Sequence, residues 1–207
     1  FTVEPEIPAA LLEQAAMECD TAVISICRFS AEDWDRKGEP NDGDFYLSLE
    51  EQKMVSDASS HFDRIVVVLN VGGMVDTSWF ACNPKIGAVL LAWQGGMEGA
   101  MAEADILCGD VNPSGKLTDT FAASFDDYPS SAGFNESRDY VCYTEDIFVG
   151  YRYFETIPGA AEKVNYPFGF GLSYTTFRLE PLISQGDDER IFVTVRVTNT
   201  GNTTGRE

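Results

Sequence analysis

Histidine and basic residues are scarce in this chain. His61 is the single histidine, and 14 lysines and arginines stand against 34 aspartates and glutamates, giving a net charge of -20 at pH 7. An acidic surface repels phosphate backbones and anionic lipids, so neither nucleic acid nor a membrane is an expected partner. The charge is consistent with a neutral or cationic small ligand.

Metal-binding patterns and long apolar runs are lacking too. The five cysteines are widely spaced and form no CxxC pair, so with one histidine we expect no zinc site, and no metal or cofactor. Cys27 and Cys108 lie in apolar runs and are expected to be small buried hydrophobes. This cysteine usage favours a reducing compartment and predicts a cytoplasmic location.

No stretch is long and apolar enough to span a bilayer. Phe1-Thr-Val-Glu-Pro5 is not a signal peptide, although we expect the chain to continue beyond both ends.

The first half of the chain alternates helical and strand patterns. Apolar spacing predicts helices over 5–20, 48–62 and 97–108 and a short one over 75–82, while apolar runs predict strands over 21–27, 64–70 and 86–93. Ser48 and Glu51 form a capping box, and His61 falls in the last turn of that helix, where a structural role is expected. The order predicts an α/β fold, a mostly parallel sheet with helices on both faces.

A polar loop after the first strand gathers the candidate chemistry of the chain. Residues 28–36 read Arg-Phe-Ser-Ala-Glu-Asp-Trp-Asp-Arg, and ligands bind outside the carboxyl ends of parallel strands, where this loop emerges. A carboxylic acid beside an apolar ring has the environment of a general acid. In the alternative, Glu32, Asp33 and Asp35 are solvated charges paired with Arg28 and Arg36.

Two glycine pairs follow the other strands. Neither Gly72-Gly73 nor Gly95-Gly96 belongs to GxGxxG or GxxxxGK[ST], which disfavours nucleotide binding and a flavodoxin-like binding domain. They are expected to let the backbone turn sharply beside a ligand.

The second half is irregular and aromatic. Residues 146–154 read as a strand, and the aromatic segment 143–174 is expected to form interdomain contact surface as well as core. In the alternative, all of its rings fold back onto the parallel sheet. An open aromatic surface would make the isolated fragment self-associate, and a homo-oligomer is an open option. Alternation over 190–199 predicts a half-buried strand. Two strands do not make a stable sandwich, so a second domain is expected to begin here.

Six blocks, in order, resemble the non-barrel part of family-3 glycoside hydrolases, the β-glucosidases and their relatives. Residues 29–36 are similar to that family's SGEGxDR loop, with Ala31 and Asp33 in place of glycines, and the other blocks cover 67–73, 92–98, 109–117, 143–154 and 166–177. The resemblance implies an α/β sandwich domain over 1–172, followed by the first strands of a fibronectin type III-like domain over 173–207. It also implies a (β/α)8 barrel domain of the same enzyme as partner.

The resemblance further implies retaining hydrolysis of terminal β-linked sugars in a glycoside or oligosaccharide. Glu32 would be the general acid/base, and the nucleophilic aspartate would lie in the barrel. Trp34, Asp33 and Arg28 are the expected substrate-binding residues, Trp34 by stacking on the sugar. The extra charge of Asp33 would raise the proton affinity of Glu32, or Asp33 would share its role. The alternative function is a non-catalytic carbohydrate-binding or scaffolding module.

Overall fold

The computed structural model describes residues 6–29, 32, 36–134 and 136–207. Contacts within the chain group the residues into two compact units. The first unit consists of Phe1–Gly99 and Asp119–Phe168, and the second of Ala100–Thr118 and Gly169–Glu207. The expected domain boundary between residues 172 and 173 stays a prediction.

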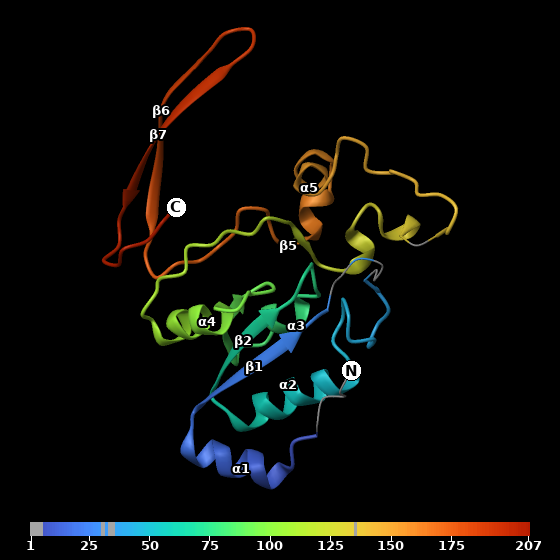
Figure 1. The fold of residues 1–207 in the computed structure, drawn as a ribbon, viewed down its shortest axis with the longest axis vertical. Coiled ribbons are helices and arrows are strands. Elements are labelled where there is room, and N and C mark those ends of the chain that lie inside the picture. The colour runs from blue at the N-terminus through green and yellow to red at the C-terminus, as the bar shows by residue number, and fades with distance from the viewer. Residues whose placement is uncertain (1–5, 30–31, 33–35, 135) are drawn as a thin grey trace. The chain divides into compact units, whose positions relative to one another are not determined.

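A three-stranded parallel sheet forms the centre of the first unit (Figure 1). β1 (Thr21–Cys27) pairs with β2 (Arg64–Asn70), which pairs with β3 (Ile86–Leu91). The register aligns Thr21 with Arg64 and Cys27 with Asn70, so the carboxyl ends of β1 and β2 meet at one edge. The mostly parallel α/β fold predicted from the sequence is therefore confirmed.

β2 is the central strand and carries the core. Ile65 and Val67 are fully buried, and Val68 and Leu69 are 5% and 2% exposed. A fully buried valine, leucine or isoleucine side chain stabilises a fold by about 1.5–3 kcal/mol relative to an exposed one. The continuous apolar run of β2 predicted a buried strand, and the structure confirms this burial.

Two helices cover one side of β1 and β2 (Figure 1). α1 (Ala9–Glu18) buries Leu12, and α2 (Leu49–His61) buries Val55 and Ala58. The helices contact each other, and α2 contacts β2. The capping box of α2 is confirmed: the Glu51 amide donates to Ser48 Oγ at 3.2 Å, and the Ser48 amide donates to Glu51 Oε2 at 2.8 Å.

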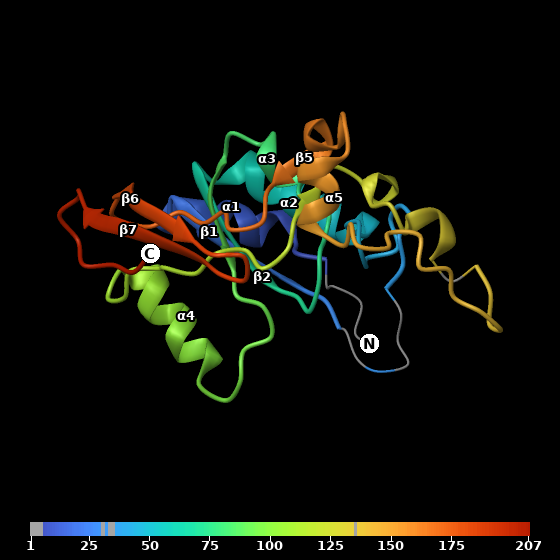
Figure 2. The ribbon, with the colours of Figure 1, turned by 90° about the horizontal axis from the view of Figure 1, so that it is seen from above.

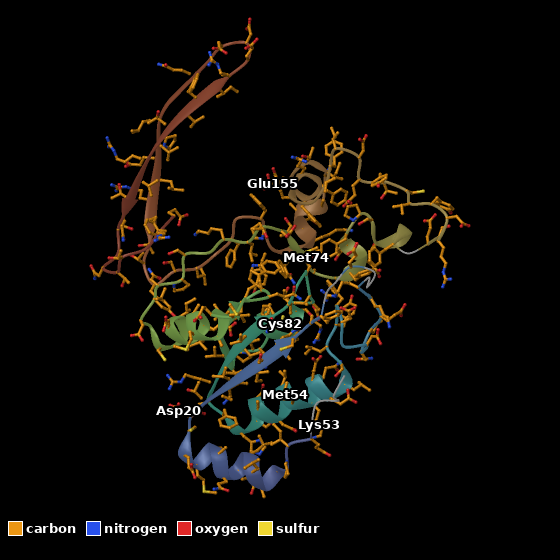
Figure 3. All side chains as sticks on the ribbon, in the orientation of Figure 1. Asp20, Lys53, Met54, Met74, Cys82 and Glu155 are labelled. Atoms are coloured by element: carbon orange, nitrogen blue, oxygen red, sulfur yellow. The ribbon has the colours of Figure 1, made fainter. Side chains whose placement is uncertain are left out.

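The ends of α2 and β1 away from the candidate loop have structural partners. His61 lies in the last turn of α2, with Nδ1 2.7 Å from the Asp57 carbonyl oxygen, as expected of a structural histidine. Asp20, labelled beside the start of β1 in Figure 3, accepts a hydrogen bond from Arg64 at 2.6 Å. Hydrogen bonds from Thr21 and Arg64 lower the pKa of the Asp20 carboxyl.

The rest of the first unit packs around a second, smaller core. β4 (Phe121–Ala122) pairs antiparallel with β5 (Val164–Tyr166). Ala122, Phe154 and Ala160 are buried together, with Tyr128 and Tyr153 packed against them. The short helical segments of this unit are α3 (Ser78–Ala81), α5 (Tyr151–Thr156), η1 (Phe125–Asp127), η2 (Ser131–Gly133) and η3 (Ala160–Lys163).

The strand predicted over 146–154 is wrong. Gly150 has a φ of 60°, which ends the run, and the next residues form α5. Phe154 of this helix is 3% exposed and lies edge-on to Tyr128 at a centroid distance of 6.0 Å. Packing of Phe154 therefore overrides the strand preference of an aromatic run.

The second unit contains α4 (Gly99–Cys108) and a hairpin of β6 (Phe177–Gly186) and β7 (Ile191–Asn199). Asn112 fastens the hairpin base: its Nδ2 donates to the Thr204 carbonyl at 2.9 Å and its Oδ1 accepts from the Tyr174 amide at 2.8 Å. Figure 2 shows the hairpin as two long strands, and Figure 3 shows side chains extending away from both of them.

The hairpin strand was predicted correctly, but its burial was not. Every residue of β7 except Thr198 is exposed, including Ile191 at 77% and Val193 at 60%. β6 and β7 form a two-stranded sheet, and two strands alone do not bury one face to give a period-two pattern.

The prediction of buried cysteines is also wrong, because all five are exposed and free. β1 buries Ile24 and Ile26 on one face, so Cys27 points to the opposite face. Cys108 ends α4, which has no buried residue. Among the described residues, no helix combines the length and the apolar character needed to cross a membrane.

Candidate functional site

Glu32 lies in the loop that leaves the carboxyl end of β1. It sits in a turn, and its side chain is exposed. Among the described residues, Glu32 has no hydrogen bond or ion pair that would occupy its carboxylate. Asp33 and Trp34 lie outside the described residues, so their predicted roles stay predictions. An exposed carboxyl group at this edge of a parallel sheet is accessible to a ligand.

Arg28 marks the beginning of this loop and is buried. Its guanidinium donates two hydrogen bonds of 2.7 Å to the two carboxylate oxygens of Glu51. It also donates to the Cys27 carbonyl at 2.7 Å and the Asp44 carbonyl at 2.6 Å. Bidentate pairs of this kind are among the strongest hydrogen-bonded contacts in proteins. The geometry makes Arg28 an anchor of the loop, and its predicted contact with substrate stays a prediction.

Arg36 marks the end of the loop and pairs with a different carboxylate. Its Nε donates to Asp44 Oδ1, and the neighbouring Lys37 amide donates to Asp44 Oδ2 at 2.7 Å. Its Nη1 and Nη2 are buried and have no hydrogen-bond partner among the described residues. Gly73 gives the guanidinium room, because a Cβ built on Gly73 would lie 3.1 Å from Nη1.

These contacts test the alternative of solvated, paired loop charges at Glu32 only, because Asp33 and Asp35 lie outside the described residues. Arg28 and Arg36 were expected to neutralise Glu32, Asp33 or Asp35 if the loop charges were merely solvated. Arg28 pairs instead with Glu51 and Arg36 with Asp44, so in the described part of the chain neither guanidinium is committed to Glu32. Sequence reasoning identified Glu51 only as a helix cap. It missed Asp44 altogether, because one aspartate in a loop dense with Gly, Asp and Asn carries no signal of its partners.

The segment around Asp44 and Phe45 packs against residues of the second core. The Phe45 amide donates to the Lys37 carbonyl at 3.1 Å, and the Asp76 amide donates to the Phe45 carbonyl at 2.9 Å. The Phe45 ring, 4% exposed, lies edge-on to Phe125 and Tyr128 at 5.5 and 6.2 Å. Asp44, the residue that both arginines contact, therefore adjoins a packed residue, Phe45.

Tyr128 is the most perturbed acid of this region. Its hydroxyl accepts from the Ala122 amide at 3.0 Å and donates to the Thr120 carbonyl at 3.3 Å. Burial raises the pKa of Tyr128 to about 12. A phenol kept neutral this strongly supports a structural role. Within the described ranges, no cluster of three or more His, Cys, Asp or Glu side chains could hold a metal ion.

A parallel α/β domain with an accessible carboxyl group at the carboxyl edge of its sheet belongs to the class of open α/β domains, which bind ligands outside the carboxyl ends of their strands. The family model described as the glycosyl hydrolase family 3 C-terminal domain matches residues 7–174. The chain belongs to this family.

Curated relatives support this membership. The chain is 52% identical to a β-glucosidase A of Butyrivibrio fibrisolvens over 99% of this chain, and 39% identical to a β-glucosidase of Ruminococcus albus over 99% of this chain. It spans 29% and 21% of the lengths of these two relatives. The similarity therefore concerns one part of much longer enzymes.

Solved structures agree. A β-glucosidase from Paenibacillus barengoltzii superposes with a TM-score of 0.87 at 40% identity, over 96% of this chain and 22% of that one. β-Glucosidase 3B from Thermotoga neapolitana, solved in complex with glucose, gives a TM-score of 0.82 at 38% identity, over 96% of this chain and 28% of that one. The fold and the family are thus shared with enzymes that are named for β-glucoside hydrolysis.

Proposed function

We propose that the chain is part of a retaining β-glycosidase of the β-glucosidase type and supplies its general acid/base, Glu32. The observation that carries this proposal is the exposed, uncommitted carboxyl group of Glu32 at the carboxyl edge of the sheet, in a family of glycosyl hydrolases. The relatives named as β-glucosidases favour a terminal β-linked glucose as the sugar.

The proposed reaction needs a second carboxylate. A barrel domain of the same enzyme supplies an aspartate that attacks the anomeric carbon while Glu32 gives its proton to the departing glycosidic oxygen. The ionised Glu32 then takes a proton from water, which attacks the anomeric carbon and releases both the sugar and the aspartate. In retaining enzymes the two carboxyl groups stand about 5–5.5 Å apart, so Glu32 must face the barrel.

The other proposed contacts follow from this arrangement. Trp34 supplies stacking surface for the leaving-group side of the substrate, and Asp33 either raises the proton affinity of Glu32 or shares its role. The β6–β7 hairpin begins a fibronectin type III-like domain, and the exposed rings of the aromatic segment 143–174, such as Tyr143 and Tyr174, contact the barrel. A cytoplasmic location of the enzyme is also proposed.

The alternative is a non-catalytic carbohydrate-binding or scaffolding module. The chain's high identity to relatives named as enzymes disfavours it. The alternative predicts that substitution of Glu32 changes sugar affinity, if anything, and leaves hydrolysis unaffected.

The test substitutes Glu32→Gln in the complete enzyme. Loss of the proton donor is expected to lower turnover of a glycoside with a poor leaving group, such as cellobiose, by about 10²–10⁴-fold. An activated aryl glucoside, whose leaving group needs little protonation, should lose far less in its first step. The values of kcat/KM on both substrates, which report the first step alone, measure the two losses. Equal losses of kcat/KM on both would remove the acid role from Glu32.

A further inference from the structure

We propose that Asp44 is a positioning residue that closes the base of the loop carrying Glu32, an inference that rests on the function proposed for Glu32. The two ends of the loop converge on this one residue. Arg28, before the loop, donates to the Asp44 carbonyl oxygen at 2.6 Å, and Arg36, after it, donates to Asp44 Oδ1. Asp44 therefore joins residues that are eight positions apart in the sequence.

The two attachments use different parts of Asp44. Its main-chain oxygen receives Arg28, while both carboxylate oxygens serve the other end of the loop, Oδ1 for Arg36 and Oδ2 for the Lys37 amide. Substitution of the side chain consequently releases the end of the loop and leaves the beginning attached. This separation makes the proposal testable by a change of one functional group.

In the described part of the chain, Arg36 has no acceptor besides Asp44. Both Nη atoms of Arg36 are buried and have no hydrogen-bond partner, so Asp44 provides the sole acceptor for this guanidinium among the described residues. Arg28 differs, because Glu51 holds it with two further hydrogen bonds of 2.7 Å. Loss of the Asp44 side chain is therefore expected to release the end of the loop at Arg36, while Glu51 still holds Arg28.

Asp44 is followed by a residue that is hydrogen-bonded to the segment after β2. The next residue, Phe45, is buried and accepts a hydrogen bond at 2.9 Å from the amide of Asp76, which follows β2. The Arg28 amide donates to the carbonyl of Asn70, the last residue of β2, at 2.9 Å. The beginning of the loop is therefore attached to the last residue of β2, and the segment around Asp44 is attached to residues that follow β2.

A closed base matters because proton transfer depends on geometry. A catalytic group must stay within about 0.5 Å of its productive position, and a displacement of about 1 Å costs on the order of 100-fold in rate. Glu32 lies midway between the two attachments, four residues from Arg28 and four from Arg36. Opening the base at Asp44 would let its carboxyl group leave the glycosidic oxygen.

The experiment compares Asp44→Asn with Asp42→Asn in the complete enzyme. The control removes an equal charge two residues away, from an exposed side chain whose ion pair with Lys37 spans 3.5 Å. Asp44→Asn is expected to lower kcat/KM at least 10-fold for cellobiose and less than 3-fold for an activated aryl glucoside, because kcat/KM reports only the step in which the leaving group departs. Asp42→Asn should change neither more than 2-fold. Equal losses on both substrates with Asp44→Asn would contradict the proposal.

The double variant Glu32→Gln/Asp44→Asn separates positioning from general stability. If Asp44 acts through Glu32, the second substitution should add less than 2-fold to the loss caused by Glu32→Gln alone. Full multiplication of the two losses would overturn the proposal while leaving the function of Glu32 intact. If Glu32→Gln itself shows no dependence on the leaving group, the proposed function falls and the role of Asp44 falls with it.

Amide hydrogen exchange gives a readout that does not depend on activity. The peptide containing Glu32 should exchange at least 10-fold faster in Asp44→Asn than in Asp42→Asn, with exchange in β2 unchanged. Equal exchange in both variants would overturn the proposal. Arg36→Lys, which keeps the charge but loses the Nε donor, is the second variant if Asp44→Asn does not fold, and it should show the same pattern.

Discussion

β2 and β7 are two apolar strands of similar length with opposite environments. In β2, Ile65 and Val67 are fully buried, whereas in β7 Ile191 and Val193 are 77% and 60% exposed. β2 has a parallel strand on each side and α2 packed against it, while β7 has only β6. Apolar content therefore favours a strand, but neighbouring layers decide whether the strand forms a core.

The comparison extends to charged pairs. Arg28 and Glu51 of the first unit form a bidentate pair whose side chains are 5% and 14% exposed. Arg190 and Asp187, at the turn of the hairpin, are 3.4 Å apart and 68% and 53% exposed. Removing one partner of a buried pair leaves an uncompensated charge, whereas exposed pairs contribute little.

The largest expected effect comes from this pair. Glu51→Gln leaves the Arg28 guanidinium without its carboxylate and weakens the cap of α2, so it should lower the free energy of unfolding by about 3–5 kcal/mol. Asp187→Asn in the hairpin should cost less than about 1 kcal/mol. Urea unfolding of the purified chain, followed by circular dichroism, measures both. Equal costs would contradict the difference drawn between the two units.

The next largest effect is expected from an isoleucine-to-alanine substitution, placed once in β2 and once in β7. Ile65→Ala creates a cavity in a fully buried site and should cost about 2–5 kcal/mol. Ile191→Ala, at a site that is 77% exposed, should cost less than about 1 kcal/mol. The same urea titration distinguishes them. A cost for Ile191→Ala as large as that for Ile65→Ala would show that another layer covers the hairpin in solution.

A smaller effect concerns buried and exposed tyrosines. Tyr128→Phe leaves the Ala122 amide without its partner and should cost about 1–3 kcal/mol, whereas Tyr143→Phe, at 90% exposure, should cost nothing measurable. Thermal unfolding of the two variants at neutral pH measures the difference.

The pKa of Tyr128 adds a pH dependence with a defined sign. Its folded pKa of about 12 lies above the ordinary value of 10.0, so its contribution is complete below pH 10 and is lost as the pH rises through 12. Between pH 10 and 12, the free energy of unfolding should therefore fall less steeply in Tyr128→Phe than in Tyr143→Phe. Parallel curves would show that Tyr128 is not buried in solution.

The sequence allowed much of the first unit to be predicted. Continuous apolar runs predicted the three parallel strands, and Ser48 with Glu51 predicted the start of α2, because these signals are local. The strand predicted over 146–154 failed because Phe154 contacts Tyr128, a partner from a distant segment. The resemblance pointed to Glu32, but Asp44 could not have been found, since its role depends on where the chain brings Arg28 and Arg36 together.

The central claim is that Glu32 is the acid/base of a retaining glycosidase. The most direct measurement adds azide to the complete Glu32→Gln enzyme turning over an activated aryl β-glucoside. Azide needs no general base, so it should restore the second step and give a glucosyl azide with the β configuration retained. No rate increase and no glucosyl azide would contradict the assignment of Glu32.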